Sequence, residues 1–250
     1  MKFLELANFL HLTECMDGVD AGDSLIYGRF ELFTCKRAGS DKKLYKELDK
    51  QYEELARSPV LSPELSTSPF GPLSLSTSRR TFISLISTLN ASFPDYDFSG
   101  VKPEQFKKDE LQLVVNNINT VLAIGFPDYQ QFASKMWGVM DEEMHLRDCV
   151  IYSYIPDPDS DPFCEEGNLW CFNYFFFNKK LRRVLFFTCR AVSKLLLSSH
   201  SDVSLGAELD EYDYEEEPYL RYDFFFSDLT DERGRDLLTI EYAVTSGTTP

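Results

Sequence analysis

The chain has 250 residues, of which 43% are hydrophobic, slightly fewer than is usual for a globular protein, so part of it is expected not to pack. Its 41 acidic and 25 basic side chains give a formal net charge of −16, which argues against direct binding to nucleic acid because phosphate backbones repel acidic chains. No apolar run approaches the roughly 20 residues that span a bilayer, so we expect a soluble, intracellular chain with no membrane partner.

The first third of the chain predicts a strand followed by a helix. Residues 26–35 alternate, which places Ile26, Phe30 and Leu32 on one face of a strand. Ser40 is a suitable cap for a helix whose apolar stripe is Leu44, Leu48, Tyr52 and Leu55.

Residues 57–80 change abruptly in composition. The stretch RSPVLSPELSTSPFGPLSLSTS holds seven Ser, two Thr and four Pro, and such residues cannot build a core. We therefore predict a flexible insert. Its three Ser-Pro pairs, at Ser58, Ser62 and Ser68, are candidate sites for proline-directed kinases; a passive linker is the alternative.

Helices are expected next. One begins at Arg79 and ends at Pro94, a second runs from Pro103 to Gly125, and a third starts near Pro127. The third helix is expected to bury the apolar residues Phe132, Met136, Val139 and Met140.

The second half of the chain turns to strands. Residues 149–154 form one, and residues 169–177 (LWCFNYFFF) are apolar on both faces, as in a central strand. A hairpin turn at Asn178-Lys179 leads into LRRVLFFTCR. Residues 201–217 contain eight acids and no Lys or Arg, which predicts disorder, and residues 219–250 hold two further strand-like pieces.

Asp157, Asp159 and Asp161 alternate in PDPDSDP, a spacing that could hold a metal ion. An EF-hand needs Gly at the sixth position and Glu at the twelfth, and these positions hold Pro162 and Asn168. A metal-dependent enzyme using this loop stays an alternative, but a proline-stiffened turn explains the pattern as well. None of the six cysteines forms a C-x-x-C pair, so the sequence supports no zinc site, disulfide framework or cofactor.

Two basic clusters contrast with the acidic background. Lys36, Arg37, Lys42, Lys43 and Lys46 flank the first strand and helix. The second cluster is at the expected hairpin and consists of Lys179, Lys180, Arg182 and Arg183. A short basic run of this kind is what nuclear import receptors bind, although a solvated turn that protects a sheet edge is the alternative.

Three blocks resemble the Maf-type global repressors of RNA polymerase III, a family unrelated to the leucine-zipper Maf factors. They are MKFLE with GRFELFTCKRAGSDKKLYKEL (28–48), DEEMHLRDCVIYSYIPDPDSDPF (141–163) and GNLWCFNYFFFNKKLRRVLFFTCR (167–190). PDYDFS (94–99) is similar to the family's link between helices. The resemblance covers residues 1–193. The family usually ends in an acidic tail, whereas this chain adds apolar segments after it.

The resemblance implies a single α/β (α+β) domain in which a mainly antiparallel sheet is flanked by helices. On this basis residues 1–56 and 81–193 are the two parts of the repressor domain and residues 57–80 are the regulatory insert. Residues 194–218 are an acidic disordered segment, and residues 219–250 are an extension of unknown role.

The resemblance also implies a function. The family is not enzymatic: it binds the clamp region of RNA polymerase III and blocks its engagement with the promoter-bound initiation factor. Kinases that phosphorylate the insert and phosphatases that reverse this would switch the chain, which would move between nucleus and cytoplasm with a nuclear import receptor. A generic acidic scaffold or chaperone for basic proteins is a further alternative.

Overall fold

The computed structural model describes residues 1–36, 39–57, 68–156, 162–163 and 165–199, all of which belong to one compact unit. The strands are β1 Lys2–Leu4, β2 Asp17–Asp20, β3 Ser24–Thr34, β4 Phe106–Asp109, β5 Cys149–Tyr154, β6 Asn168–Asn178 and β7 Arg183–Ser193. The helices of these ranges are α1 Ala7–Cys15, α2 Gly39–Arg57, α4 Ser76–Ser92, α5 Leu111–Gly125, α6 Tyr129–Met144 and α7 Lys194–Ser199. None of these helices combines the length and apolar character that crossing a membrane requires.

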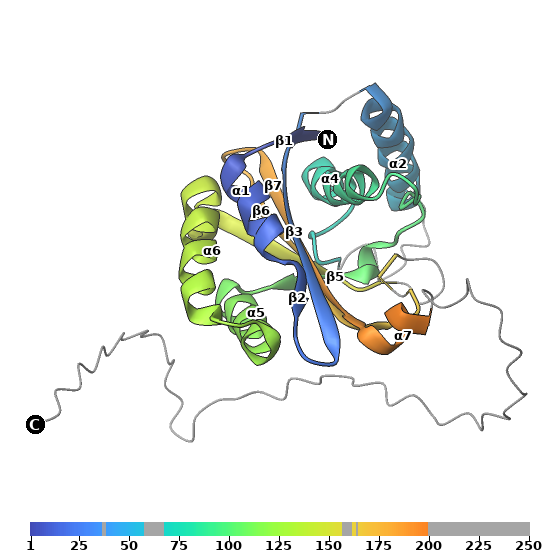
Figure 1. Ribbon diagram of the computed structural model, residues 1–250. Helices are drawn as coiled ribbons and strands as arrows, with labels where there is room; N and C mark the ends of the chain where they lie inside the picture. The colour runs from blue at the N-terminus through green and yellow to red at the C-terminus, as the bar shows by residue number, and fades with distance from the viewer. Residues whose placement is uncertain (37–38, 58–67, 157–161, 164, 200–250) are drawn as a thin grey trace, which may run out of the picture. The chain divides into compact units, whose positions relative to one another are not determined.

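The seven strands form one antiparallel sheet in the order β1-β3-β7-β6-β5-β4, and β2 also pairs with β3. Strands β3 and β7 pair over eleven residues, from Ser24 opposite Ser193 to Thr34 opposite Arg183. Helices cover both faces: α1, α5 and α6 lie on one side, and α2 and α4 on the other (Figure 1). The expected mainly antiparallel sheet flanked by helices is therefore confirmed.

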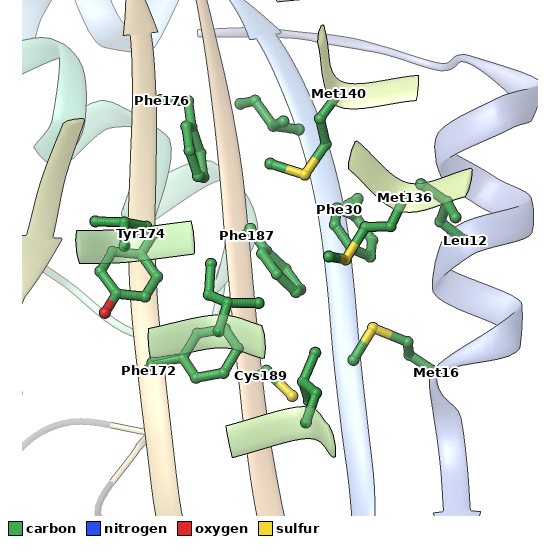
Figure 2. Close-up of a cluster of buried hydrophobic side chains, with 14 of the residues drawn as sticks. Leu12, Met16, Phe30, Met136, Met140, Phe172, Tyr174, Phe176, Phe187 and Cys189 are labelled. Carbon is green, nitrogen blue, oxygen red and sulfur yellow. The ribbon is translucent and has the colours of Figure 1, made fainter. Parts of the chain in front are cut away.

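The face of the sheet beneath α1, α5 and α6 carries aromatic and sulfur-containing side chains. Phe30 of β3 stacks on Phe187 of β7, with ring centroids 4.0 Å apart. Met136 and Met140 of α6 are fully buried against this aromatic layer (Figure 2). Unbranched methionine side chains adapt to the irregular gaps between rings, so one helix can cover three strands. The expected burial of both methionines is confirmed.

The opposite face is covered by α2, α4 and the segment that precedes α4. Phe175 and Phe186 stack with ring centroids 4.5 Å apart, and both are fully buried. Phe70 lies over this layer, with its ring 5.1 Å from that of Phe82 and 4.8 Å from that of Tyr152. Since Leu73 is also fully buried, the chain is already packed several residues before α4 begins.

The structure corrects two expected boundaries. The single helix expected from Pro103 to Gly125 is wrong, because this stretch holds a short 3₁₀ turn (Pro103–Gln105), the edge strand β4 and then α5. Helix α4 begins at Ser76 rather than Arg79, so residues 68–80 of the expected flexible insert form a packed turn and a helix. The remainder of that insert, residues 58–67, lies outside the described residues.

At the other end, residues 194–199 of the segment expected to be disordered form α7. Residues 200–218 and the extension 219–250 lie outside the described residues.

Candidate functional site

The two basic clusters of the sequence meet at one surface hollow of about 930 Å³, which we call the basic hollow. It is lined by Cys35, Lys36, Gly39, Lys42, Lys43, Tyr45, Lys46, Arg80 and Arg182. Six of these nine residues are cations, and all six are exposed. They come from four segments: the end of β3, helix α2, helix α4 and the β6–β7 hairpin.

Sheet register brings the first of these segments to the hairpin. Because Thr34 pairs with Arg183, the chain that leaves β3 runs beside the hairpin turn, and the Cys35 amide donates to the Arg182 carbonyl oxygen at 2.8 Å. The turn is fixed from below by Asn178, which is fully buried. Its Nδ2 donates to the Met144 carbonyl oxygen at 2.7 Å, and its Oδ1 accepts from the Leu181 amide at 3.0 Å.

Arg182 occupies an unusual backbone conformation. Its φ of 55° is in the left-handed region, which costs a residue with a Cβ roughly 1–2 kcal/mol and favours Gly or Asn. The side chain at this position is nevertheless an arginine, and it faces the hollow.

The other wall of the hollow depends on contacts between α2 and α4. Arg79 Nε donates to Asp49 Oδ1 at 2.6 Å, and its Nη1 donates to the carbonyl oxygens of Leu73 and Ser74. The next residue, Arg80, points outward and donates from Nε to the Tyr45 hydroxyl at 3.3 Å. Arg79 therefore fixes the helix pair, while Arg80 extends from it into the hollow.

The cations of the basic hollow face solvent. Among the residues whose side chains the structure describes, which leaves out Asp41, no carboxylate lies within ion-pair distance of any of the six. The neighbouring hairpin cations differ: Lys180 Nζ lies 2.9 Å from Asp148 Oδ1, and Arg183 Nη1 lies 3.1 Å from Glu143 Oε2. The four residues expected to form an import signal are thus divided, since two are ion-paired, Arg182 lines the hollow and Lys179 is exposed.

Of the three expected phosphorylation sites, the structure describes only one. Ser58 and Ser62 lie outside the described residues. Ser68 begins the turn that places Phe70, and its hydroxyl donates to the Gly71 carbonyl oxygen at 2.5 Å. Arg79 and Arg80, in the same part of the chain, differ in their surroundings: Arg79 is buried with its Nε and Nη1 bonded within the protein, whereas Arg80 is exposed.

A second hollow, of about 470 Å³, lies between α1, β3, β7 and the residues Phe93, Tyr96, Pro162, Phe163 and Glu165. Several of its polar and charged groups contact other groups of the protein. Arg190 Nη1 lies 3.1 Å from Glu165 Oε2, the Tyr96 hydroxyl donates to Glu165 Oε1 at 3.0 Å, and the Arg29 guanidinium lies 4.6 Å from the centre of the Phe93 ring. These internal contacts make it a poorer site for a charged ligand than the basic hollow.

A metal centre and a reactive thiol each set requirements that can be compared with the described residues. In the described ranges, no group of three His, Cys, Asp or Glu side chains is placed to hold a metal ion, and Asp157, Asp159 and Asp161 lie outside those ranges. Burial, with nearby Asp148 and Asp141, raises the pKa of the Cys149 thiol to about 12, and burial also raises the pKa of Cys189. Both thiols are therefore protonated at neutral pH and are weak nucleophiles.

The fold thus brings six exposed cations together at one surface hollow on a mixed α+β domain. In comparison with known proteins, residues 26–188 match the model of the Maf1 regulator family. The "Repressor of RNA polymerase III transcription" of Dictyostelium discoideum is 39% identical over 85% of this chain and 94% of its own length. The Schizosaccharomyces pombe "Repressor of RNA polymerase III transcription maf1" is 41% identical over 78% of this chain and 84% of its own.

A crystal structure of citrus MAF1 is similar as well, with a TM-score of 0.60, 32% identity, and coverage of 75% of this chain and 99% of the citrus chain. The chain therefore belongs to the Maf1 regulator family, as the three blocks resembling the Maf-type repressors predicted. Because this family consists of regulators whose named members are transcriptional repressors, the expectation that the chain is not an enzyme is confirmed.

Sequence reasoning identified the cations of the hollow but not the hollow. Residues 36–46 and 179–183 are far apart in the chain, and only the β3–β7 register joins them. Arg80 belongs to neither of the two basic clusters of the sequence. The sequence does contain one signal for this arrangement: a strand ends in a basic run, and a later hairpin carries a second basic run. This pattern could have suggested that the two runs lie close together.

Proposed function

We propose that this chain represses RNA polymerase III transcription by binding the polymerase at its clamp region, which blocks engagement with the promoter-bound initiation factor. One observation carries the proposal: the chain is 39% identical to a named repressor of this transcription over 94% of that repressor's length. The Schizosaccharomyces pombe relative, 41% identical over 84% of its own length, is likewise named a repressor of this transcription and supports the same proposal.

Charge gives a physical reason for this mode of action. A polymerase holds nucleic acid with positively charged surfaces, since phosphate neutralisation dominates such binding. A chain with a formal net charge of −16 is complementary to those surfaces and is itself repelled by DNA. It can therefore occupy a place that promoter complexes use without binding the promoter.

Phosphorylation of the insert is proposed as the switch, with Ser58 and Ser62 as the principal sites. Each phosphate adds about −1.5 to −2 charges at neutral pH. Arg80 lies exposed at the start of α4, just after the insert, and can make bidentate hydrogen bonds to phosphate. Ser68 is a poorer site, because its hydroxyl is bonded within the turn that positions Phe70.

The test is the affinity of purified polymerase for the chain before and after treatment with a proline-directed kinase. We expect tight binding before treatment and weaker binding after it. The variant Ser58→Ala/Ser62→Ala should bind equally in both conditions, whereas Ser68→Ala should still respond to the kinase. Failure of the untreated chain to bind polymerase would contradict the repressor proposal, and an unchanged affinity after treatment would reject the switch alone.

The hairpin cations are proposed to assist nuclear import, so that the chain is found in both nucleus and cytoplasm. The variant Lys179→Gln/Arg182→Gln removes the two hairpin cations that make no ion pair in the described residues. It should be more cytoplasmic than the matched variant Lys108→Gln/Lys135→Gln, which removes two exposed lysines elsewhere. Equal nuclear fractions for the two variants would remove the hairpin from the import proposal.

A further inference from the structure

The basic hollow has the properties of a built anion site that the repressor function does not require. Its six cations surround one concavity, and the N-terminus of α2 joins them there, since Gly39, the first residue of that 19-residue helix, lines the hollow. The amide groups at a helix N-terminus carry partial positive charge and point toward a bound anion. Two different sources of positive potential therefore act at the same point.

The framework around these cations is rigid, which favours a defined ligand over a loose counterion cloud. The Cys35–Arg182 backbone hydrogen bond joins two walls, and the buried Asn178 fixes the hairpin turn. Arg79, only 6% exposed at its side chain, joins α2 to α4. All of these contacts are made within the protein itself, so they hold the walls of the hollow in place, and a preorganised site loses little conformational freedom when a ligand binds.

The lining residues favour phosphate over carboxylate. Arg80 and Arg182 present planar guanidinium groups that can bind two phosphate oxygens at once, and four lysines supply compact ammonium charges. One phosphate cannot neutralise six cations. A ligand with several phosphate groups can, and a volume of about 930 Å³ accommodates a molecule of that size.

The surroundings favour a small ligand over a nucleic-acid strand. Apart from the six cations of the hollow, residues 1–199 carry 27 acidic and 16 basic side chains. A long polyanion that extends past the hollow therefore meets an excess of acidic groups, whereas a compact one stays among the cations.

We propose that the basic hollow binds a small molecule that carries several phosphate groups. Lys36, Lys42, Lys43 and Lys46 surround its phosphates on one side, and Arg80 and Arg182 bind them on the other. This site is independent of polymerase binding, so either proposal can fail while the other stands.

The experiment is titration calorimetry on the full chain at about 0.15 M salt, with inositol hexakisphosphate, pyrophosphate, inorganic phosphate and citrate as probes. Affinity should fall in that order, because it follows the number of phosphate groups in one molecule. Citrate, with three carboxylates, should bind more weakly than pyrophosphate. Since all six cations are exposed, changing them leaves the fold intact, which circular dichroism can verify.

Two double variants with equal charge change separate the site from general electrostatics. Lys43→Gln/Arg182→Gln should weaken inositol hexakisphosphate binding at least about tenfold, the effect of losing one charge-assisted hydrogen bond. Lys108→Gln/Lys135→Gln removes two exposed lysines that do not line the hollow and should leave the affinity within about twofold.

Three results would overturn the proposal. They are no binding of inositol hexakisphosphate at millimolar concentration, equal losses in the two double variants, and tighter binding of a single-stranded oligonucleotide than of inositol hexakisphosphate. The last result would assign the hollow to a nucleic-acid backbone.

Discussion

Arg79 is the residue on which the α2–α4 wall of the basic hollow most depends. Its guanidinium is 6% exposed and is bonded to Asp49 and to the carbonyl oxygens of Leu73 and Ser74. Replacing Arg79 with Met leaves these acceptors without their donor, and breaking such a buried pair costs about 3–5 kcal/mol. The free energy of unfolding in urea measures the loss.

The exposed pair Lys50–Glu54 on the same helix supplies the control for Arg79. Lys50→Met breaks an ion pair whose two side chains are mostly in water, so the expected loss is about 1 kcal/mol or less. Equal losses for the two variants would show that Arg79 does not hold the helices together.

Phe175 and Trp170 lie on the same strand but differ in burial. Phe175 is fully buried and stacks on Phe186, whereas Trp170 is half-buried near the start of β6. We expect Phe175→Ala to cost about 3–5 kcal/mol and Trp170→Ala clearly less. The melting temperatures of the two variants compare these losses. Phe175→Leu serves as a milder substitution if the alanine variant does not fold. A larger loss for Trp170→Ala would contradict this placement of β6.

Buried tyrosines predict instability at high pH. Burial raises the pKa of Tyr52, with a contribution from nearby Glu104, and that of Tyr152, each to about 12. In the unfolded chain a tyrosine ionises near pH 10, so the unfolded state loses protons first as the pH rises. Stability is therefore complete below about pH 10 and decreases between about pH 10 and 12.

Tyrosinate absorbance and circular dichroism, followed together, test this pH dependence. The two buried tyrosines should ionise only as the fold is lost. Ionisation of all thirteen tyrosines near pH 10 with the fold intact would be the contrary result.

At the level of the secondary-structure elements, the β6–β7 hairpin contains a residue, Arg182, whose backbone conformation costs stability. Arg182→Gly removes the Cβ that makes a φ of 55° costly, so it should leave the chain as stable as, or up to about 1 kcal/mol more stable than, the original. Arg182→Gln keeps the Cβ and gains nothing from the backbone. The free energy of unfolding of both variants, measured by chemical denaturation, separates the effect of the backbone from that of the side chain. A greater loss of stability with Gly than with Gln would contradict this interpretation of the turn.

The sequence predicted elements with clear periodicity. Strand β3 alternates, and Ile26, Phe30 and Leu32 do lie in one core. Strand β4 was missed because its four residues, Phe106–Asp109, bury only the first and show no alternation. The start of α4 was placed too late since Ser-rich residues resemble a linker, and only the packing of Phe70 and Leu73 orders them.

At the scale of the whole molecule, the site depends on register and therefore could not be predicted locally. The two basic clusters are more than 130 positions apart, and they meet because Thr34 pairs with Arg183. The ion pairs of Lys180 and Arg183 with α6 and its following turn are likewise tertiary features. The composition of the sequence indicated the basic residues, and the eleven-residue pairing of β3 with β7 brings them close together.

The charge distribution is the other feature of the whole molecule that bears on function. Residues 200–250 hold fourteen acidic and three basic side chains, which is most of the formal charge of −16. The remainder of the chain is thus much closer to neutral and presents one concentrated basic surface. The acidic and the basic charge are thus concentrated in different parts of the sequence.

Transcription of a transfer-RNA gene by purified RNA polymerase III and its initiation factors tests the central claim most directly. Adding the purified chain to polymerase before the promoter complex forms should reduce transcript in proportion to the polymerase bound. Adding it to a reaction driven by RNA polymerase II should have no effect. Undiminished transfer-RNA synthesis at a concentration of chain that saturates the polymerase would contradict the account.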